Sequence, residues 1–318
     1  MANLARIATV TLNPALDQTA QATNFHTGRV NRVTSEHADA GGKGVNVASF
    51  LSAYGYPVVA TGLLGRANLE PFEDLFAEKG ITDRFVKVPG TTRVNVKLVD
   101  RIRELITEIN FPGITADAES VSAVMETVLA LADDGVRWFV LSGSLPTGVQ
   151  TDTYRQMVEQ LKARGCKVVL DTSGIPFDRA LSARPHVVKP NIDELQEVVG
   201  SSLGTLEEIV TAARALADGA IELSVVSMRD RGALFVTSEA AVLAVPPKAR
   251  IVSTVGAGDA MVAGITHGLL SGLSLPEIAR LSTAFSLGAL GELGPNMLPK
   301  EDIEAFAELV EVTELKIG

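Results

Sequence analysis

The sequence has only one cysteine and no long hydrophobic run. Cys166 therefore cannot form an intrachain disulfide, and its apolar neighbours indicate a packing residue rather than a nucleophile. No stretch approaches the roughly 20 apolar residues that a membrane-spanning helix needs, so no membrane partner is expected. The first residues have neither the charged start nor the apolar core of a signal peptide, which makes the cytoplasm the expected location.

Positive charge is also scarce. The chain has 28 Lys and Arg residues against 38 Asp and Glu, and its net charge is −10. A sequence-independent nucleic-acid binder needs a basic surface, so no nucleic-acid partner is expected. The same negative field repels phosphates, so any anion site must be built locally from a few basic side chains and backbone N–H groups. The four histidines show no metal-ligand spacing, which argues against a zinc site.

Short apolar runs alternate with amphipathic segments along the chain. Strands are expected at 7–12, 58–63, 138–141, 167–170, 186–188 and 223–227. Helices are expected at 44–54, 69–79, 117–132, 151–164, 192–199, 205–217, 257–271, 275–290 and 300–310. Strands and helices in alternation predict right-handed βαβ units, and therefore an α/β fold with a mostly parallel sheet and helices on both faces.

Two segments interrupt this alternation. Residues 17–38 and 84–110 have an extended, Val-, Thr- and Asn-rich character, and 93–99 alternates with period two, as a half-buried strand does. We expect them to form a small β-sheet that serves as a lid over a site or as a homodimer surface. No linker, low-complexity tract or internal repeat divides the chain, so 1–318 is expected to be a single domain.

The strongest local signal is the run Ser-Thr-Val-Gly-Ala-Gly-Asp-Ala at 253–260, between a β-like stretch and a helical pattern. Small residues let backbone N–H groups approach a ligand, and a helix N-terminus adds unpaired donors and a positive dipole end. Such a loop can hold a phosphate, and Asp259 in the first turn can accept a proton from an attacking hydroxyl. The alternative is an acidic residue that only interacts with the helix dipole.

A second signal is Ala-Gly-Gly-Lys-Gly-Val-Asn-Val-Ala at 40–48, which also opens a helix. The amide of Asn46 can both donate to and accept from sugar hydroxyls. A plain loop-to-helix transition is the alternative, although three glycines in four residues cost chain entropy. Lys43 is followed by Gly44 rather than Ser or Thr, so this is no Walker A loop. A dinucleotide-binding fingerprint needs Gly-x-Gly-x-x-Gly after the first strand. Gly256 and Gly258 are followed by Met261 at the place of the third glycine, and they lie near the C-terminus, which argues against this fingerprint.

Together these motifs resemble, in this order, the paired signatures of the ribokinase-like kinases, the phosphofructokinase B family. The runs Thr-Leu-Asn-Pro-Ala-Leu-Asp at 11–17, Ser-Gly-Ser-Leu-Pro at 142–146 and Lys-Pro-Asn-Ile-Asp-Glu-Leu at 189–195 are similar to three more family segments. The resemblance covers nearly the whole chain. It implies a ribokinase-like three-layer fold and a sugar kinase that uses ATP and Mg²⁺.

The resemblance also implies roles for individual residues. Asp259 is expected to be the catalytic base, with the backbone N–H groups of Gly256, Ala257 and Gly258 forming the anion hole. Asn191 and Glu194 are expected to organise Mg²⁺ through water. The residues expected to bind nucleotide are Lys189, Asn191, Ser227, Arg229, Gly232, Thr254, Gly256 and Gly258. Those expected to bind the sugar phosphate are Asp17, Arg29, Gly42, Lys43, Asn46, Arg93, Asn95 and Ser144, with the two arginines and the serine at the substrate phosphate.

The stretches 28–33 and 110–113 look most like the 1-phosphofructokinase subgroup. That resemblance implies phosphorylation of fructose 1-phosphate to fructose 1,6-bisphosphate. Tagatose-6-phosphate kinase and 6-phosphofructokinase are the enzymatic alternatives, a catalytically silent sugar-phosphate sensor is the non-enzymatic one, and a nicotinamide-dependent oxidoreductase ranks third.

The sequence departs from the family pattern in three places. Ser253 stands where many members have Asp, as in several sugar-phosphate members. Arg229 replaces the first glycine of a Ser-x-Gly-x-x-Gly stretch at 227–232, which bears on nucleotide preference. The run 100–104 lacks the Gly or Asn typical of a tight turn.

Overall fold

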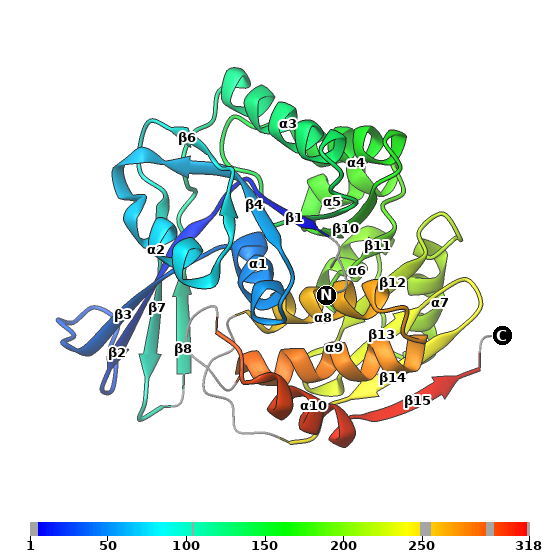
Figure 1. The fold of residues 1–318 in the computed structure, drawn as a ribbon. Helices are drawn as coiled ribbons and strands as arrows, with labels where there is room; N and C mark the ends of the chain where they lie inside the picture. The colour runs from blue at the N-terminus through cyan, green and yellow to red at the C-terminus, as the bar shows by residue number, and fades with distance from the viewer. Residues whose placement is uncertain (1–5, 104, 249–255, 291–295, 317–318) are drawn as a thin grey trace.

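A central sheet runs through the molecule with helices on both faces (Figure 1). The computed structural model describes residues 6–103, 105–248, 256–290 and 296–316. The strands of the main sheet are β1 (Ile7–Thr11), β4 (Val58–Gly65), β5 (Thr82–Asp83), β6 (Val86–Val88), β9 (Trp138–Ser142), β10 (Lys167–Asp171), β11 (Val187–Val188), β12 (Leu223–Ser227), β13 (Ala233–Val236), β14 (Ala241–Val245) and β15 (Glu311–Leu315). Their order is β15-β14-β13-β12-β11-β10-β9-β1-β4-β5, and β6 pairs with β4. The pairs from β5 to β12 are parallel and those from β12 to β15 are antiparallel.

Ten helices follow or flank these strands. They are α1 (Lys43–Ala53), α2 (Glu70–Lys79), α3 (Ala118–Asp133), α4 (Thr153–Ala163), α5 (Gly174–Leu181), α6 (Ile192–Val199), α7 (Leu206–Leu216), α8 (Ala257–Leu270), α9 (Leu275–Leu290) and α10 (Lys300–Leu309) in the described residues, with short 3₁₀ turns η1 (Arg66–Asn68) and η2 (Arg229–Arg231). The sequence encodes several of their ends. Asp117 caps α3 by accepting from the N–H of Ser120, and glycines in the left-handed region, Gly80 and Gly200, end α2 and α6.

The strands are apolar on both faces because each face carries a core. Along β1, Ile7 belongs to the core cluster that contains residues of α1, α2, α8, α9 and α10, whereas Ala8 belongs to the cluster that contains residues of α3, α4 and α5. Val140 and Leu141 divide in the same way on β9, as the period of two along a strand requires. A third cluster packs α6 and α7 against β12 and β13. Figure 1 shows the two main helical layers above and below the sheet, which confirms the predicted three-layer α/β arrangement.

A separate four-stranded sheet projects from this body (Figure 1). Its order is β3 (Val33–Gly41), β2 (Ala15–Ala22), β7 (Arg93–Asp100), β8 (Leu105–Ile109), and we call it the projecting sheet. The prediction of a small extra sheet is confirmed, but its second segment begins at Arg93 rather than at 84, because β6 pairs with β4 of the main sheet. Asp100 makes the turn after β7 without Gly or Asn, since its carboxylate accepts from the N–H groups of Ile102 and Arg103.

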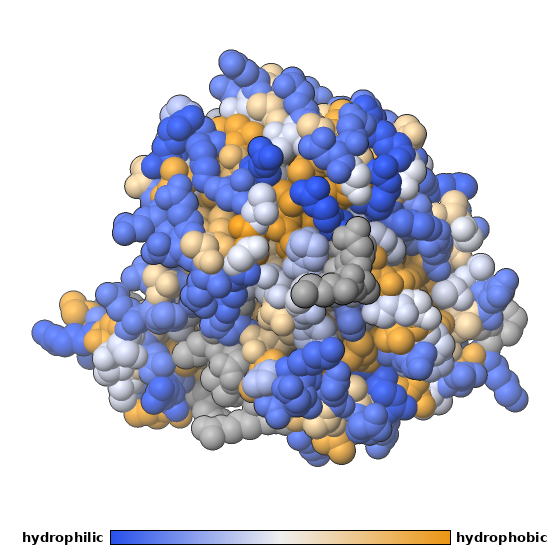
Figure 2. Space-filling view, viewed as in Figure 1, coloured by the Kyte–Doolittle hydropathy of each residue, from blue (hydrophilic) through white to orange (hydrophobic). Residues whose placement is uncertain are grey.

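All predicted strands and helices of the main body occur with ends within two residues of those expected. The elements that the sequence did not predict are α5 and the strands β5, β13, β14 and β15. Hydrophilic residues cover most of the face seen in Figure 2, with hydrophobic ones on the projecting sheet. The exposed apolar residues there include Leu105, Ile106 and Ile109 of β8. Within the described ranges, no helix combines the length and the apolar character needed to cross a bilayer.

Candidate active site

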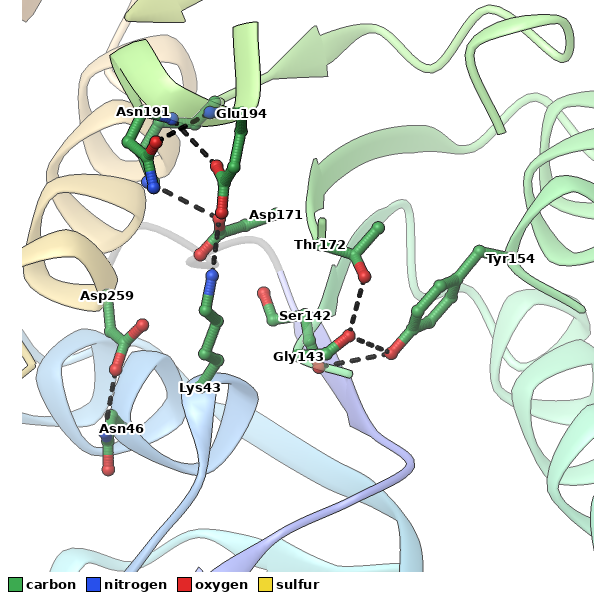
Figure 3. A network of polar contacts seen from close by, with 11 residues as sticks. Lys43, Asn46, Ser142, Gly143, Tyr154, Asp171, Thr172, Asn191, Glu194 and Asp259 are labelled. Carbon is green, nitrogen blue, oxygen red and sulfur yellow. Dashed lines mark hydrogen bonds and ion pairs between the residues drawn. The ribbon is translucent and has the colours of Figure 1, made fainter. Parts of the chain in front are cut away.

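The candidate site lies at the carboxyl ends of the parallel strands, where ligands bind in open α/β sheets. Helix α1 begins there after the turn that follows β3, and the N-terminus of α8 packs beside it. The last residues of β9 and β10, Ser142 and Asp171, come from the same edge of the sheet. Figure 3 shows side chains from α1, β10, α6 and α8 converging at this place.

The two glycine-rich motifs meet through a buried hydrogen bond. The Asn46 amide Nδ2 donates to Oδ2 of Asp259 over 2.7 Å (Figure 3). A Cβ added to Gly41 would lie 2.9 Å from Oδ2 of Asp17 and 3.5 Å from Oδ1 of Asn46, so Asp17 of β2 lies in the same group. Asn46 Oδ1 is buried without a hydrogen-bond partner among the described residues, and it can therefore accept from a ligand hydroxyl.

Asp259 has the properties of a general base. It lies in the first turn of α8 and is 7% exposed. Burial raises its pKa to about 6, the nearby charge of Asp171 adds to this effect, and Lys43 opposes it. A carboxyl group with a pKa near neutrality is well matched to accept a proton from a hydroxyl.

Two lysines share one buried carboxylate beside Asp259. Asp171 is fully buried, and its Oδ1 lies 3.1 Å from Nζ of Lys43 and 3.4 Å from Nζ of Lys189. Burial alone would raise the pKa of Asp171, but the ammonium groups of Lys189 and Lys43 hold it below its usual value. Burial would lower the pKa of Lys43, yet Asp171, Asp259 and Glu194 raise it above its usual value. The Lys43 side chain therefore remains cationic beside Asp171 and Asp259.

The N-terminus of α8 completes an anion-binding arrangement. Gly256 adopts a left-handed φ of 78°, and in the described part of the chain no side chain caps the helix. The first backbone N–H groups therefore remain open to a ligand. A Cβ added to Gly258 would lie 3.6 Å from Nζ of Lys189, so that cation faces the same helix end. Thr254, also predicted to bind nucleotide, lies outside the described residues.

Buried hydrogen bonds fix the turn that follows β9. The Tyr154 hydroxyl donates to the carbonyl of Gly143 over 3.0 Å, and the Thr172 hydroxyl donates to the same oxygen over 2.8 Å (Figure 3). On the other side Asn13 Nδ2 donates to Oγ of Ser144 over 3.1 Å. The Ser144 hydroxyl, which is predicted to contact the substrate phosphate, is thus hydrogen-bonded to the segment between β1 and β2.

Asp17 and its neighbours form the sugar side of the site. The Asn95 amide donates to Oδ1 of Asp17 over 3.2 Å, and its own oxygen accepts from the N–H of Phe111. Gly42 has a φ of 111°, and a Cβ there would lie 2.8 Å from Cα of Pro14. A glycine is therefore required where the early motif passes the first strand.

The two predicted phosphate-binding arginines differ in position. Arg93 lies at the site, but its guanidinium already donates to the carbonyls of Asn13, Pro14 and Phe111 over 3.0, 3.3 and 2.9 Å. Arg93 therefore links the segment after β1 to the segment after β8, and two of its guanidinium N–H groups remain for a ligand. Arg29 is exposed in the connection beyond the end of β2, which runs roughly 16 Å from Asp17 at about 3.3 Å per residue. No contact among the described residues brings Arg29 to the site.

The nucleotide side is organised by the start of α6. Asn191 and Glu194 form a capping box, in which Asn191 Oδ1 accepts from the N–H of Glu194 and Glu194 Oε2 accepts from the N–H of Asn191. A β-bridge joins Asn191 to Ser227 at the end of β12. Gly232 has a φ of 87° and would clash with the carbonyl of Ala244 if it carried a Cβ, so it fixes the following strand.

Arg229 occupies a left-handed position, with φ 57°, where the family pattern has glycine. Its guanidinium forms an exposed ion pair of 2.6 Å with Asp193 in the first turn of α6. The side chain therefore lies against α6 and does not fill the loop.

Asp171 and Asn13 were not among the residues predicted from the sequence. A signal for Asp171 exists, because it is a carboxylate directly at the carboxyl end of an apolar strand pattern. Asn13 had no comparable signal, because its hydrogen-bond partners, Pro112 and Ser144, lie 99 and 131 positions away in the sequence.

Comparisons with known proteins agree with this arrangement. Residues 10–301 match the pfkB family of carbohydrate kinases. The chain is 49% identical to a 1-phosphofructokinase of Rhodobacter capsulatus over 98% of both chains, and 35% identical to the Escherichia coli K12 1-phosphofructokinase over 96% of this chain and 98% of that one. Among solved structures, Escherichia coli phosphofructokinase-2 in complex with substrates and products superposes with a TM-score of 0.88 at 28% identity, over 95% of this chain and 98% of that chain. The motif order, the geometry of the site and these matches have one explanation: the chain belongs to the pfkB family of carbohydrate kinases.

Proposed function

We propose that this kinase transfers the γ-phosphoryl group of ATP to the 6-hydroxyl of fructose 1-phosphate, forming fructose 1,6-bisphosphate. One observation carries the proposal: a buried carboxylate with a raised pKa, Asp259, lies beside the ammonium groups of Lys189 and Lys43 and a helix N-terminus that no described side chain caps. This is what phosphoryl transfer to an alcohol needs, namely a base for the hydroxyl and positive groups for the transferring phosphoryl. The choice of sugar is supported by the full-length relatives that are 1-phosphofructokinases.

In the proposed mechanism Asp259 accepts the proton of the attacking hydroxyl as the new O–P bond forms and the bond to ADP breaks. Asn46 orients this carboxylate through its 2.7 Å hydrogen bond. The backbone N–H groups of Gly256, Ala257 and Gly258 hold the γ-phosphoryl oxygens, and Lys43 and Lys189 offset the charge that builds up on them. Asp171 keeps both ammonium groups in place before the substrates bind.

The donor set is compatible with Mg²⁺ held mainly through water and phosphate. Among the described residues no group of three or more His, Cys, Asp or Glu side chains forms a ready metal cage. Mg²⁺ at phosphates, however, needs only one or two carboxylates. Oδ2 of Asp171 is buried and has no hydrogen-bond partner in the described part of the chain, while Asn191 and Glu194 each commit one oxygen to the capping box. Glu194 and Asp171 would hold the hydrated ion, which when bound would neutralise phosphate charge.

The sugar phosphate would lie between the projecting sheet and β9. Asp17, Asn95 and Asn46 would contact its hydroxyls, and Ser144 with the remaining N–H groups of Arg93 its phosphate. The projecting sheet then acts as a lid that excludes water from the reaction. Hydrogen exchange in β7 and β8 should slow when fructose 1-phosphate is added, and unchanged exchange would contradict the lid.

A homodimer through the projecting sheet is part of the proposal. The edge strand β8 exposes Leu105, Ile106 and Ile109, and exposed sheet edges favour pairing. The relative phosphofructokinase-2 forms a tetramer in its inhibited state. Arg29 can bind substrate only if a second copy supplies it. Light scattering of the purified chain should give twice the monomer mass.

The decisive experiment is an ADP-release assay with fructose 1-phosphate, fructose 6-phosphate and tagatose 6-phosphate side by side. Fructose 1-phosphate should give the highest kcat/KM. A higher value for either other sugar would replace the proposed substrate. Binding of all three without ADP release would favour the catalytically silent sensor.

A further inference from the structure

A row of charged side chains crosses one face of the projecting sheet. Asp17 on β2 stands directly opposite Asn95 on β7 and Asp39 on β3, and Thr19 stands opposite Lys97 and His37. Residues in register share a face, and so do residues two apart on one strand. Lys97, Asp17, Asp39 and His37 therefore lie on the face that carries the sugar side of the site.

Lys97 is buried although it is a lysine on a peripheral sheet. It is 7% exposed, and its Nζ lies 3.5 Å from Oδ2 of Asp17. Glu108 on β8 stands directly opposite Lys97, yet among the described residues no ion pair joins them. The ammonium instead reaches diagonally toward β2, the neighbour on the other side of β7, and pairs with Asp17. A lysine that only served surface solvation would be expected to pair with Glu108, because that carboxylate is more exposed than Asp17.

Asp17 needs such a partner because another carboxylate faces it. Asp39 lies directly across the β2–β3 pair, and like charges in that position repel. Burial raises the pKa of Asp39; His37, 2.9 Å away, opposes this effect, and the charge of Asp17 adds to it. Each oxygen of Asp17 then has its own partner: Oδ1 accepts a hydrogen bond from Asn95, and Oδ2 forms an ion pair with Lys97.

We propose that Lys97 is a positioning residue for sugar binding, which holds the Asp17 carboxylate in the orientation that accepts hydrogen bonds from the hydroxyls of the ketohexose phosphate. Asn95 fixes one oxygen and Lys97 the other, so that the remaining lone pairs of Asp17 point to the sugar. This inference rests on the proposed function, in which Asp17 contacts sugar hydroxyls. Lys97 itself acts through Asp17, and its effect should be confined to the sugar.

The test compares Lys97→Met with Glu108→Gln, a matched control on the same face. Lys97→Met should raise the KM for fructose 1-phosphate about tenfold or more, because it leaves the Asp17 carboxylate without the cation of a largely buried ion pair. The KM for ATP should stay within about twofold, and Glu108→Gln should change neither constant by more than about twofold. Lys97→Arg should restore part of the affinity. A KM for the sugar within about twofold of wild type in Lys97→Met would overturn the inference.

A double-mutant cycle separates positioning from a general structural effect. If Lys97 acts through Asp17, Lys97→Met should add nothing to the loss already caused by Asp17→Asn, whereas independent, additive losses would refute the role. Lys97→Gln is prepared in parallel, and the same criteria apply to it if the Met variant does not fold. If wild type turns over another sugar phosphate instead, the proposed substrate fails, and the Lys97 criteria are then applied to that sugar. A wild type that neither binds nor phosphorylates any of the three sugars would remove both conclusions.

Discussion

Replacing Asp259 by Asn separates the catalytic role of this residue from its structural one. The substitution keeps the size of the side chain and an oxygen that can accept from Asn46, and it removes the negative charge that would take the proton. Loss of a general base typically costs about 10²- to 10⁴-fold in rate. We therefore expect kcat to fall by about that factor, with the KM for fructose 1-phosphate changed only slightly.

The same variant should be more stable than wild type at neutral pH. Folding raises the pKa of Asp259 from 3.8 to about 6, so the folded protein binds this proton more tightly than the unfolded chain does. Stability is consequently lost as pH rises from about 4 to about 6, and the loss is complete at pH 7. A shift of about two units corresponds to a loss on the order of 3 kcal/mol at most, and Asn at this position avoids it.

Steady-state kinetics and urea unfolding of the two proteins at pH 7 and at about pH 4 test both parts. The expected result is a variant that is nearly inactive yet harder to unfold at pH 7, with the stability difference vanishing at the lower pH. A kcat within about tenfold of wild type would refute the role of Asp259 as base. A variant less stable than wild type at pH 7 would show that burial does not raise the pKa of this carboxyl.

Three further predictions follow from the site. The kcat/KM of wild type should fall with unit slope as pH drops below about 6, because protonated Asp259 cannot act as base; a flat profile from pH 5 to 8 would contradict this. Arg93→Lys should lose most of the three hydrogen bonds to carbonyls, which should lower the unfolding free energy by about 1–3 kcal/mol and weaken sugar-phosphate binding. Unchanged stability in urea would show that these hydrogen bonds do not stabilise the fold. Asp171→Asn should lower the unfolding free energy by about 3 kcal/mol, because it leaves the buried Lys189 and the partly exposed Lys43 without their shared counter-ion. The exposed control Asp193→Asn should cost less than about 1 kcal/mol, and equal effects of the two would argue against the buried cluster.

Much of the site was predictable because its parts are local signals. The helix at 257–270 and its small residues are encoded in one short run, and so is the capping box of Asn191 and Glu194. The interpretation of Arg93 was incomplete, since a side chain's partners are not visible in its own segment. The carbonyls of Phe111 and Pro14, which accept hydrogen bonds from its guanidinium, lie 18 and 79 positions away in the sequence.

Local sequence patterns specify the alternation of strands and helices, the layered α/β architecture, the glycines at positions that need them, and the chemical groups available for phosphoryl transfer. These depend on periodicity and on short-range backbone geometry, which neighbouring residues fix. Which groups face one another follows from the folded arrangement instead. Asn46 meets Asp259 across 213 positions of chain, two lysines share Asp171, and Lys97 pairs with Asp17 rather than with Glu108. Such contacts depend on how strands line up and how helix ends converge, and those are properties of the packed whole.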